Sequence, residues 1–290
     1  MASEEFRKLT AYMAANPMPR LGHAEMREQM KAFGRRARLP DDAQVEMPAD
    51  APVPARIFTP ANAQPGVILF AHGGGFTLGS IESHAHVAAW LAQASQRAVL
   101  IFDYRLAPEH PCPAALEDFR AIHQWAMAQR YPSHPIVLAG DSAGANLSLS
   151  LVVSREVTAP AAIVALSPSI DLAAYLALDP GSIADKSVDA GAIAEGFRAY
   201  IGKISATDSR VSPNYGNLTG LPPTFLQLAQ QEVFAPGALE FAEKAKAAGA
   251  IVEVDIWPEM PHDWHWYAPR LPEAREALQR AGDFIKRRLI

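Results

Sequence analysis

The most constraining feature of this 290-residue chain is a G-x-S-x-G pattern at residues 140–144, centred on Ser142. An apolar run at residues 136–139 precedes the pattern, and residues 145–153 can continue it as a helix. Strand, tight turn and helix in this order form a nucleophile elbow, whose strained turn lifts the serine hydroxyl clear of the sheet. Glycines flank the serine because the backbones come too close for a Cβ. The alternative is a glycine-rich turn that contains a serine by chance. Other motifs of the chain are needed to distinguish the two interpretations.

Apolar runs and helical spacings alternate along the chain. A short antiparallel pair of strands is predicted at residues 45–47 and 55–58, and buried strands at 67–71, 98–103, 136–139, 161–166, 224–229 and 251–256. Helices are predicted at residues 83–96, 114–129, 145–153, 238–248 and 271–289. This alternation predicts an α/β fold with a mostly parallel central sheet and helices on both faces.

Two segments fall outside the alternation. Residues 1–38 contain two helical stretches with apolar faces, which need a surface to pack on and form either a lid or an appendage. Between about residues 173 and 213 the alternation stops, and only residues 190–201 have helical spacing.

The pattern His-Gly-Gly-Gly at residues 72–75 follows a buried strand, at the carboxyl edge of the sheet where α/β folds place their sites. The amides of Gly73 and Gly74, together with the amide of Ala143, are suited to an oxyanion hole. The alternative is a phosphate-binding loop. Such a loop needs a lysine and a serine or threonine at set offsets, and the residues after Gly75 do not supply them.

A serine nucleophile needs a base, and His262 follows the last predicted strand at the same edge of the sheet. In this type of fold the chain order is nucleophile, acid, histidine, which excludes the histidines that precede Ser142. His265 is the second candidate for the base.

The acid is expected on the loop after the strand at residues 224–229. Glu232 is the only carboxylate of that loop. Asp255 and Asp263 are the alternatives, because they lie nearer to His262 in the sequence.

The composition excludes several classes of function. The net charge of −5 gives no basic excess for binding nucleic acid. No apolar run reaches the ~18 residues of a membrane span, and the charged residues 1–20 do not resemble a signal peptide. A single cysteine, Cys112, permits no intrachain disulfide and no Cys/His metal cluster. We therefore expect a cytoplasmic protein without metal or cofactor.

With these motifs in hand, the chain resembles the hormone-sensitive lipase family of α/β-hydrolases over about residues 45–288. The resemblance rests on residues 72–76, 103–111, 140–146 and 260–262, with further similarity at 212–215 and 220–223. It implies a serine carboxylesterase with Ser142 as nucleophile and His262 as base, and we expect short-chain carboxylic esters, which are small molecules, as its substrates. It also implies oxyanion donors at Gly73, Gly74 and Ala143.

The same resemblance implies a helical cap. The chain then divides into an N-terminal part of the cap (1–40), an α/β-hydrolase core (41–172), a cap insert (173–213) and the rest of the core (214–290). Phe76 and Phe197 are candidate walls of an apolar acyl pocket. The acid loop departs from the family pattern at Ala229 and at residues 235–237, so the choice between Glu232 and the two aspartates stays open.

Other functions remain compatible with these residues. One alternative is a non-catalytic ligand-binding protein on a hydrolase scaffold, since fold does not determine function. Amide hydrolysis is another. We also expect a possible homodimer, because the last strand, with Val254 and Ile256, should form an edge of the sheet.

Overall fold

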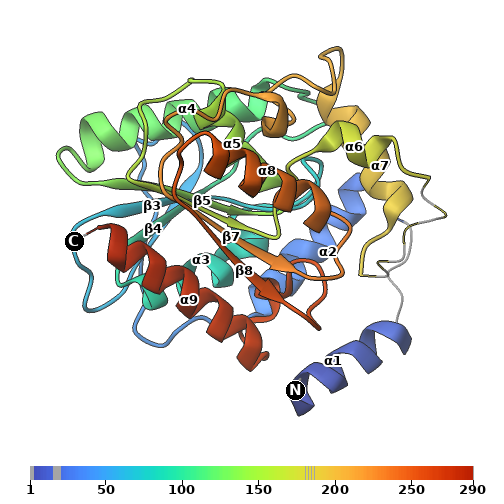
Figure 1. Cartoon of the computed structure of the whole chain (residues 1–290). Coiled ribbons are helices and arrows are strands. Elements are labelled where there is room, and N and C mark those ends of the chain that lie inside the picture. Colours follow the sequence, from blue (N-terminus) through green and yellow to red (C-terminus); the bar gives the residue numbers. More distant parts are fainter. Residues whose placement is uncertain are drawn as a thin grey trace.

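An eight-stranded sheet forms the centre of the molecule in the computed structural model (Figure 1). The structure describes residues 3–15, 21–179, 181, 183, 185 and 187–289, so parts of segments 1–40 and 173–213 lie outside the described residues. The strand order is β1-β2-β4-β3-β5-β6-β7-β8. The strands are β1 (Gln44–Glu46), β2 (Ala55–Thr59), β3 (Val67–Ala71), β4 (Ala98–Phe102), β5 (Ile136–Asp141), β6 (Ala162–Leu166), β7 (Thr224–Ala229) and β8 (Val252–Trp257).

Strands β1 and β2 pair antiparallel to each other, and β2 pairs antiparallel to β4. The pairings among β3 to β8 are all parallel. Because parallel strands are covered on both faces, every residue of β3 to β7 is buried, and β3, β4 and β6 are apolar throughout. The predicted α/β-hydrolase fold with a mostly parallel sheet is confirmed, and β8 is an edge strand as expected.

Helices cover both faces of the sheet. The α-helices of the described residues are α1 (Glu4–Ala15), α2 (His23–Arg36), α3 (Ile81–Ser95), α4 (Ala114–Trp125), α5 (Ala143–Val153), α6 (Leu172–Leu176), α7 (Ala190–Ile201), α8 (Ala235–Ala247) and α9 (Pro272–Arg288). Helices α3 and α9 pack together against one face, whereas α4, α5 and α8 lie on the other (Figure 1). Ile68 and Leu69 illustrate the alternation along β3, because they belong to the apolar clusters of opposite faces.

The two N-terminal helices pack at different places. Helix α2 lies on α3, and Arg27 donates hydrogen bonds to the carbonyl oxygens of Thr77 (2.8 Å) and Ala107 (3.0 Å). Helix α1 lies apart from α6 and α7 in Figure 1, and Ser3, just before it, hydrogen-bonds Glu273 at the start of α9.

Helix α7, which belongs to the insert at residues 173–213, packs on the 72–76 loop. The ring of Tyr200, in α7, stacks on the ring of Phe76 with a centroid separation of 3.7 Å. A Cβ placed on Gly196 would lie 3.1 Å from the carbonyl oxygen of Gly75, so α7 approaches this loop closely. None of the helices in the described part of the chain has the length and apolar character that a membrane crossing requires.

Candidate active site

Ser142 occupies a strained turn between β5 and α5. Its backbone dihedrals are φ 49° and ψ −112°, and a non-glycine residue adopts this positive φ only at a cost. A Cβ on Gly144 would lie 1.9 Å from the carbonyl oxygen of Ala71. A Cβ on Gly140 would lie 2.4 Å from the carbonyl carbon of Gly144. Glycine is therefore required at both positions, as expected for a nucleophile elbow.

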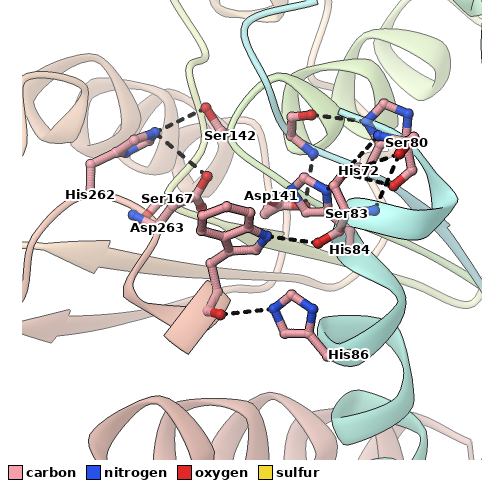
Figure 2. A network of polar contacts seen from close by, with 12 residues as sticks. His72, Ser80, Ser83, His84, His86, Asp141, Ser142, Ser167, His262 and Asp263 are labelled. Atoms are coloured by element: carbon pink, nitrogen blue, oxygen red, sulfur yellow. Dashed lines mark hydrogen bonds and ion pairs between the residues drawn. The ribbon is translucent and has the colours of Figure 1, made fainter. Parts of the chain in front are cut away.

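His262 bridges Ser142 and Glu232. Its Nε2 atom lies 3.0 Å from Ser142 Oγ, and its Nδ1 atom lies 2.7 Å from Glu232 Oε2 (Figure 2 shows His262 directed at Ser142). The other carboxylate oxygen of Glu232 accepts a hydrogen bond from the amide of Ala229 at 3.2 Å. The structure thus brings together three residues from separate loops. The glutamate after β7 and the histidine after β8 lie 90 and 120 positions after the strained serine in the chain.

The alternative residues are bound elsewhere. Asp255 Oδ2 accepts hydrogen bonds from Gln227 (2.8 Å) and the Trp257 indole (3.0 Å), so it belongs to the sheet edge. His265 is buried, and its Nε2 lies 2.8 Å from the Gln227 side-chain oxygen. Asp263 is closer to the site, with Oδ2 3.7 Å from His262 Nε2.

The three bridged residues are almost fully enclosed. Ser142 is 7% exposed, and the side chains of His262 and Glu232 are 9% and 0% exposed. The ring of Phe234 meets the His262 ring edge to face at 5.0 Å. Electrostatic interactions among these groups are therefore stronger than they would be in water.

The pKa of His262 is raised from 6.5 to about 9. Burial lowers this pKa, but the charges of Asp263, Glu232 and Asp185 and the hydrogen bond to Glu232 outweigh burial. Burial and the neighbouring Asp141 raise the pKa of Asp263 well above its usual range. Burial thus favours the neutral form of the Asp263 carboxyl group.

The structure differs from expectation at Gly73. Its amide donates to Asp141 Oδ1 at 3.0 Å, and a Cβ on Gly73 would lie 2.5 Å from Asp141 Oδ2. Asp141 Oδ2 also lies 3.2 Å from Nε2 of His84, on α3 (Figure 2). Because its hydrogen is already used, Gly73 is not a free oxyanion donor. Among the described residues, the amides of Gly74, Gly75 and Ala143 donate no hydrogen bond.

Sequence reasoning missed this role of Asp141. Its position next to the serine in the G-x-S-x-G pattern was the one signal in the sequence. Its partners, the Gly73 amide and the His84 ring, lie far away in the chain. His72 lies nearby, and its ring stacks on Tyr104 at 4.2 Å. Burial and the charge of His84 lower the pKa of His72 to about 3, so His72 is neutral at physiological pH.

Phe76 and Phe197 were expected to line an acyl pocket, and the structure places both in the core. Phe76 is 0% exposed and Phe197 is 1% exposed, so neither offers surface to a ligand. Their rings meet at 5.8 Å, and Phe197 also contacts Phe234, which in turn contacts His262. The two phenylalanines therefore support the site by packing α7 against the 72–76 loop.

No group of three or more His, Cys, Asp or Glu side chains within the described ranges is arranged to hold a metal ion. What the geometry can perform is proton transfer from Ser142 to His262, with Glu232 fixing the imidazole tautomer by accepting from Nδ1.

Comparisons with known proteins agree with this geometry. A family model described as the alpha/beta hydrolase fold matches residues 68–266. An acetyl-hydrolase from Streptomyces hygroscopicus is 35% identical, over 99% of this chain and 97% of that protein. A crystal structure of an esterase from the bacterial hormone-sensitive lipase family has a TM-score of 0.90 at 32% identity and covers 100% of both chains. The crystal structure of EstE5 soaked with p-nitrophenyl butyrate has a TM-score of 0.90 at 34% identity and covers 99% of both chains.

Proposed function

Because the chain belongs to the hormone-sensitive lipase family of α/β-hydrolases and is a carboxylic ester hydrolase, we propose that it cleaves short-chain esters by acyl transfer through Ser142, His262 and Glu232. The observation that carries this proposal is the pair of contacts of His262, 3.0 Å to Ser142 Oγ and 2.7 Å to Glu232 Oε2. This is the arrangement in which a histidine activates a serine and a carboxylate supports the histidine.

The reaction proceeds in two steps. Ser142 Oγ attacks the ester carbonyl carbon while His262 Nε2 takes the hydroxyl proton. His262 then gives that proton to the alcohol as it leaves. In the second step His262 takes a proton from water, which attacks the acyl carbon. His262 then returns this proton to Ser142 Oγ as the bond to the acyl group breaks and the acid leaves. Glu232 stays ionised throughout and stabilises the imidazolium.

The oxyanion of each tetrahedral intermediate is bound by backbone amides. We assign this role to Gly74 and Ala143, with Gly75 in place of Gly73, because the Gly73 amide is bound to Asp141. The Ala143 amide begins helix α5, where the helix dipole favours negative charge. Each donor contributes ~2.7–4 kcal/mol to transition-state stabilisation by comparison with single-donor deletions in other hydrolases.

The preference for short acyl chains rests on the enclosed site. Ser142 is 7% exposed, and aromatic side chains fill the space between α7 and the 72–76 loop. The Streptomyces relative is named an acetyl-hydrolase, which favours the same preference. We also propose that α2, α6 and α7 form the cap, from segments 1–40 and 173–213.

A panel of p-nitrophenyl esters from acetate to laurate tests this function, with Ser142→Ala as the inactive control. We expect the largest kcat/KM between acetyl and hexanoyl. Faster hydrolysis of emulsified long-chain triglyceride would contradict the short-chain preference. A fluorophosphonate probe separates an esterase from a non-catalytic binding protein, because only an activated serine is labelled.

A further inference from the structure

The insert between β6 and β7 touches both loops of the proposed triad. Ser187 Oγ accepts a hydrogen bond from the backbone amide of His262 at 3.1 Å. Asp185 Oδ2 accepts a hydrogen bond from the backbone amide of Val233 at 3.1 Å, directly after Glu232 in the chain. Two side chains of the insert, two positions apart, thus contact the histidine loop and the acid loop.

Asp185 and Ser187 also bind each other. Asp185 Oδ1 accepts hydrogen bonds from the Ser187 amide (2.9 Å) and from the Ser187 hydroxyl. A hydroxyl has a single hydrogen, and Ser187 uses it on Asp185. Its oxygen lone pairs are therefore free to accept from His262. The direction of every hydrogen bond is therefore fixed: His262 donates to Ser187, and both Ser187 and Val233 donate to Asp185.

The charge of Asp185 also reaches the imidazole. Asp185 is one of the groups that raise the pKa of His262, after Asp263 and Glu232. The charge of Asp185 also acts on Tyr175, in α6. Burial, followed by the charges of Asp185 and Asp189, raises the pKa of Tyr175 to about 12. Tyr175 is thus neutral and does not compensate the charge of Asp185.

We propose that Asp185 and Ser187 are positioning residues of the esterase. They hold the loop of His262 and the loop of Glu232 in a fixed position relative to each other. The inference rests on the proposed triad. Catalytic side chains have to be held within a fraction of an ångström, and a small displacement by a residue outside the reaction lowers the rate strongly. His262 and Glu232 come from separate loops, after β8 and β7, and the pair Asp185–Ser187 joins these loops by side-chain contacts from a third segment.

The test compares Ser187→Ala with Ser187→Thr. Alanine removes the acceptor of the His262 amide, so kcat should fall about tenfold with KM little changed. Threonine keeps the hydroxyl and should restore kcat to near the wild-type value. Ser205→Ala is the matched control, because Ser205 lies in the same insert, is exposed, and its hydroxyl contacts Thr207 instead of the triad loops.

Asp185→Asn removes the negative charge of Asp185 and keeps the shape of its side chain. The variant should move the acidic limb of the kcat/KM profile to lower pH, because the imidazolium of His262 loses one stabilising carboxylate. An NMR titration of the His262 ring should show the same downward shift.

The proposal is overturned if Ser187→Ala keeps the wild-type kcat and pH profile, if it behaves like Ser205→Ala, or if threonine fails to restore kcat. A wild-type protein that neither hydrolyses esters nor reacts with the fluorophosphonate probe contradicts the proposed function instead. In that case the NMR titration of His262 in Asp185→Asn still tests whether Asp185 acts on His262, because an unchanged pKa of His262 refutes this influence.

Discussion

At the scale of single residues, the most specific prediction concerns the loss of activity when Glu232 is replaced. Its carboxylate lies 2.7 Å from His262 Nδ1 and is held by the Ala229 amide at 3.2 Å. Glu232→Gln replaces an acceptor with an amide and leaves the imidazolium without its counter-charge. By comparison with the loss of the acid in other triads, kcat should fall by up to ~10⁴. Steady-state kinetics on an acetyl ester, with circular dichroism to verify folding, measures this loss.

Two aspartate variants serve as controls for Glu232→Gln. Asp255→Asn should keep most of the activity, because Asp255 binds Gln227 and Trp257 at the edge of the sheet. Asp263→Asn should also cost far less, because asparagine has the shape of the protonated acid that burial favours at this position. An active Glu232→Gln together with an inactive aspartate variant would show that the acid is assigned wrongly.

The pH dependence of activity follows from the pKa of His262. Ser142 can lose its proton only to a neutral imidazole, so the protonated form below this pKa is inactive. Burial lowers this pKa, but the charges of Asp263, Glu232 and Asp185 and the hydrogen bond to Glu232 outweigh burial and raise it to about 9. We expect kcat/KM to rise with pH up to about pH 9. His72 and His265, whose pKa values are lowered to about 3 chiefly by burial, do not titrate there. A profile that is flat from pH 6 to 9 would contradict this expectation.

The residues of the site differ in how well the sequence could predict them. Ser142, Glu232 and His262 each follow a strand of a parallel sheet, so the chain order alone brought them to one edge. The hydrogen bond of the Gly73 amide could not be predicted from the chain order. It depends on an acceptor at Asp141, 68 positions away, whose orientation is fixed by His84. Side-chain direction within a loop depends on such contacts, and spacing does not encode them.

At the scale of elements, the central strands were predictable because they are covered on both faces, and β3, β4 and β6 are apolar throughout. Helix α6 was missed, since five residues are too few to show a helical period. Helix α8 begins at Ala235, three residues before the predicted start. The sequence Ala-Pro-Gly reads as a loop, but proline is well suited to the first turn of a helix.

The contact of α2 with α3 yields a prediction for Gly34. A Cβ at this position would lie 2.1 Å from the Glu82 carbonyl oxygen and 2.6 Å from Ser83 Cα, both backbone atoms. Gly34→Ala must therefore push the helices apart, although alanine is the better helix former. We expect a loss of ~1–3 kcal/mol in the free energy of unfolding, as for other overpacked contacts. Thermal and urea unfolding measure the loss, and a melting temperature at or above that of the wild type would refute the close contact.

At the scale of the whole molecule, the sheet has two edges, β1 and β8. Strand β1 has three residues, whereas β8 has six and carries Ile256, which is 46% exposed. The charged side chains beside Ile256 are neutralised within the chain, as in the ion pair of Asp255 with Arg280 at 2.9 Å. A long edge strand without net repulsion is a template for a second strand.

We therefore expect a homodimer in which β8 pairs with its copy around a two-fold axis, because an isologous contact closes after two subunits. Light scattering at micromolar concentration should give twice the chain mass of 31.3 kDa. Ile256→Lys places two like charges near the axis and should give monomers that remain folded, since the side chain is exposed. Met47→Lys, at a 72% exposed position just after β1, is the control at the opposite edge and should leave the dimer intact. A dimer lost in Met47→Lys and kept in Ile256→Lys would move the interface to β1, and a monomeric wild type would exclude both edges.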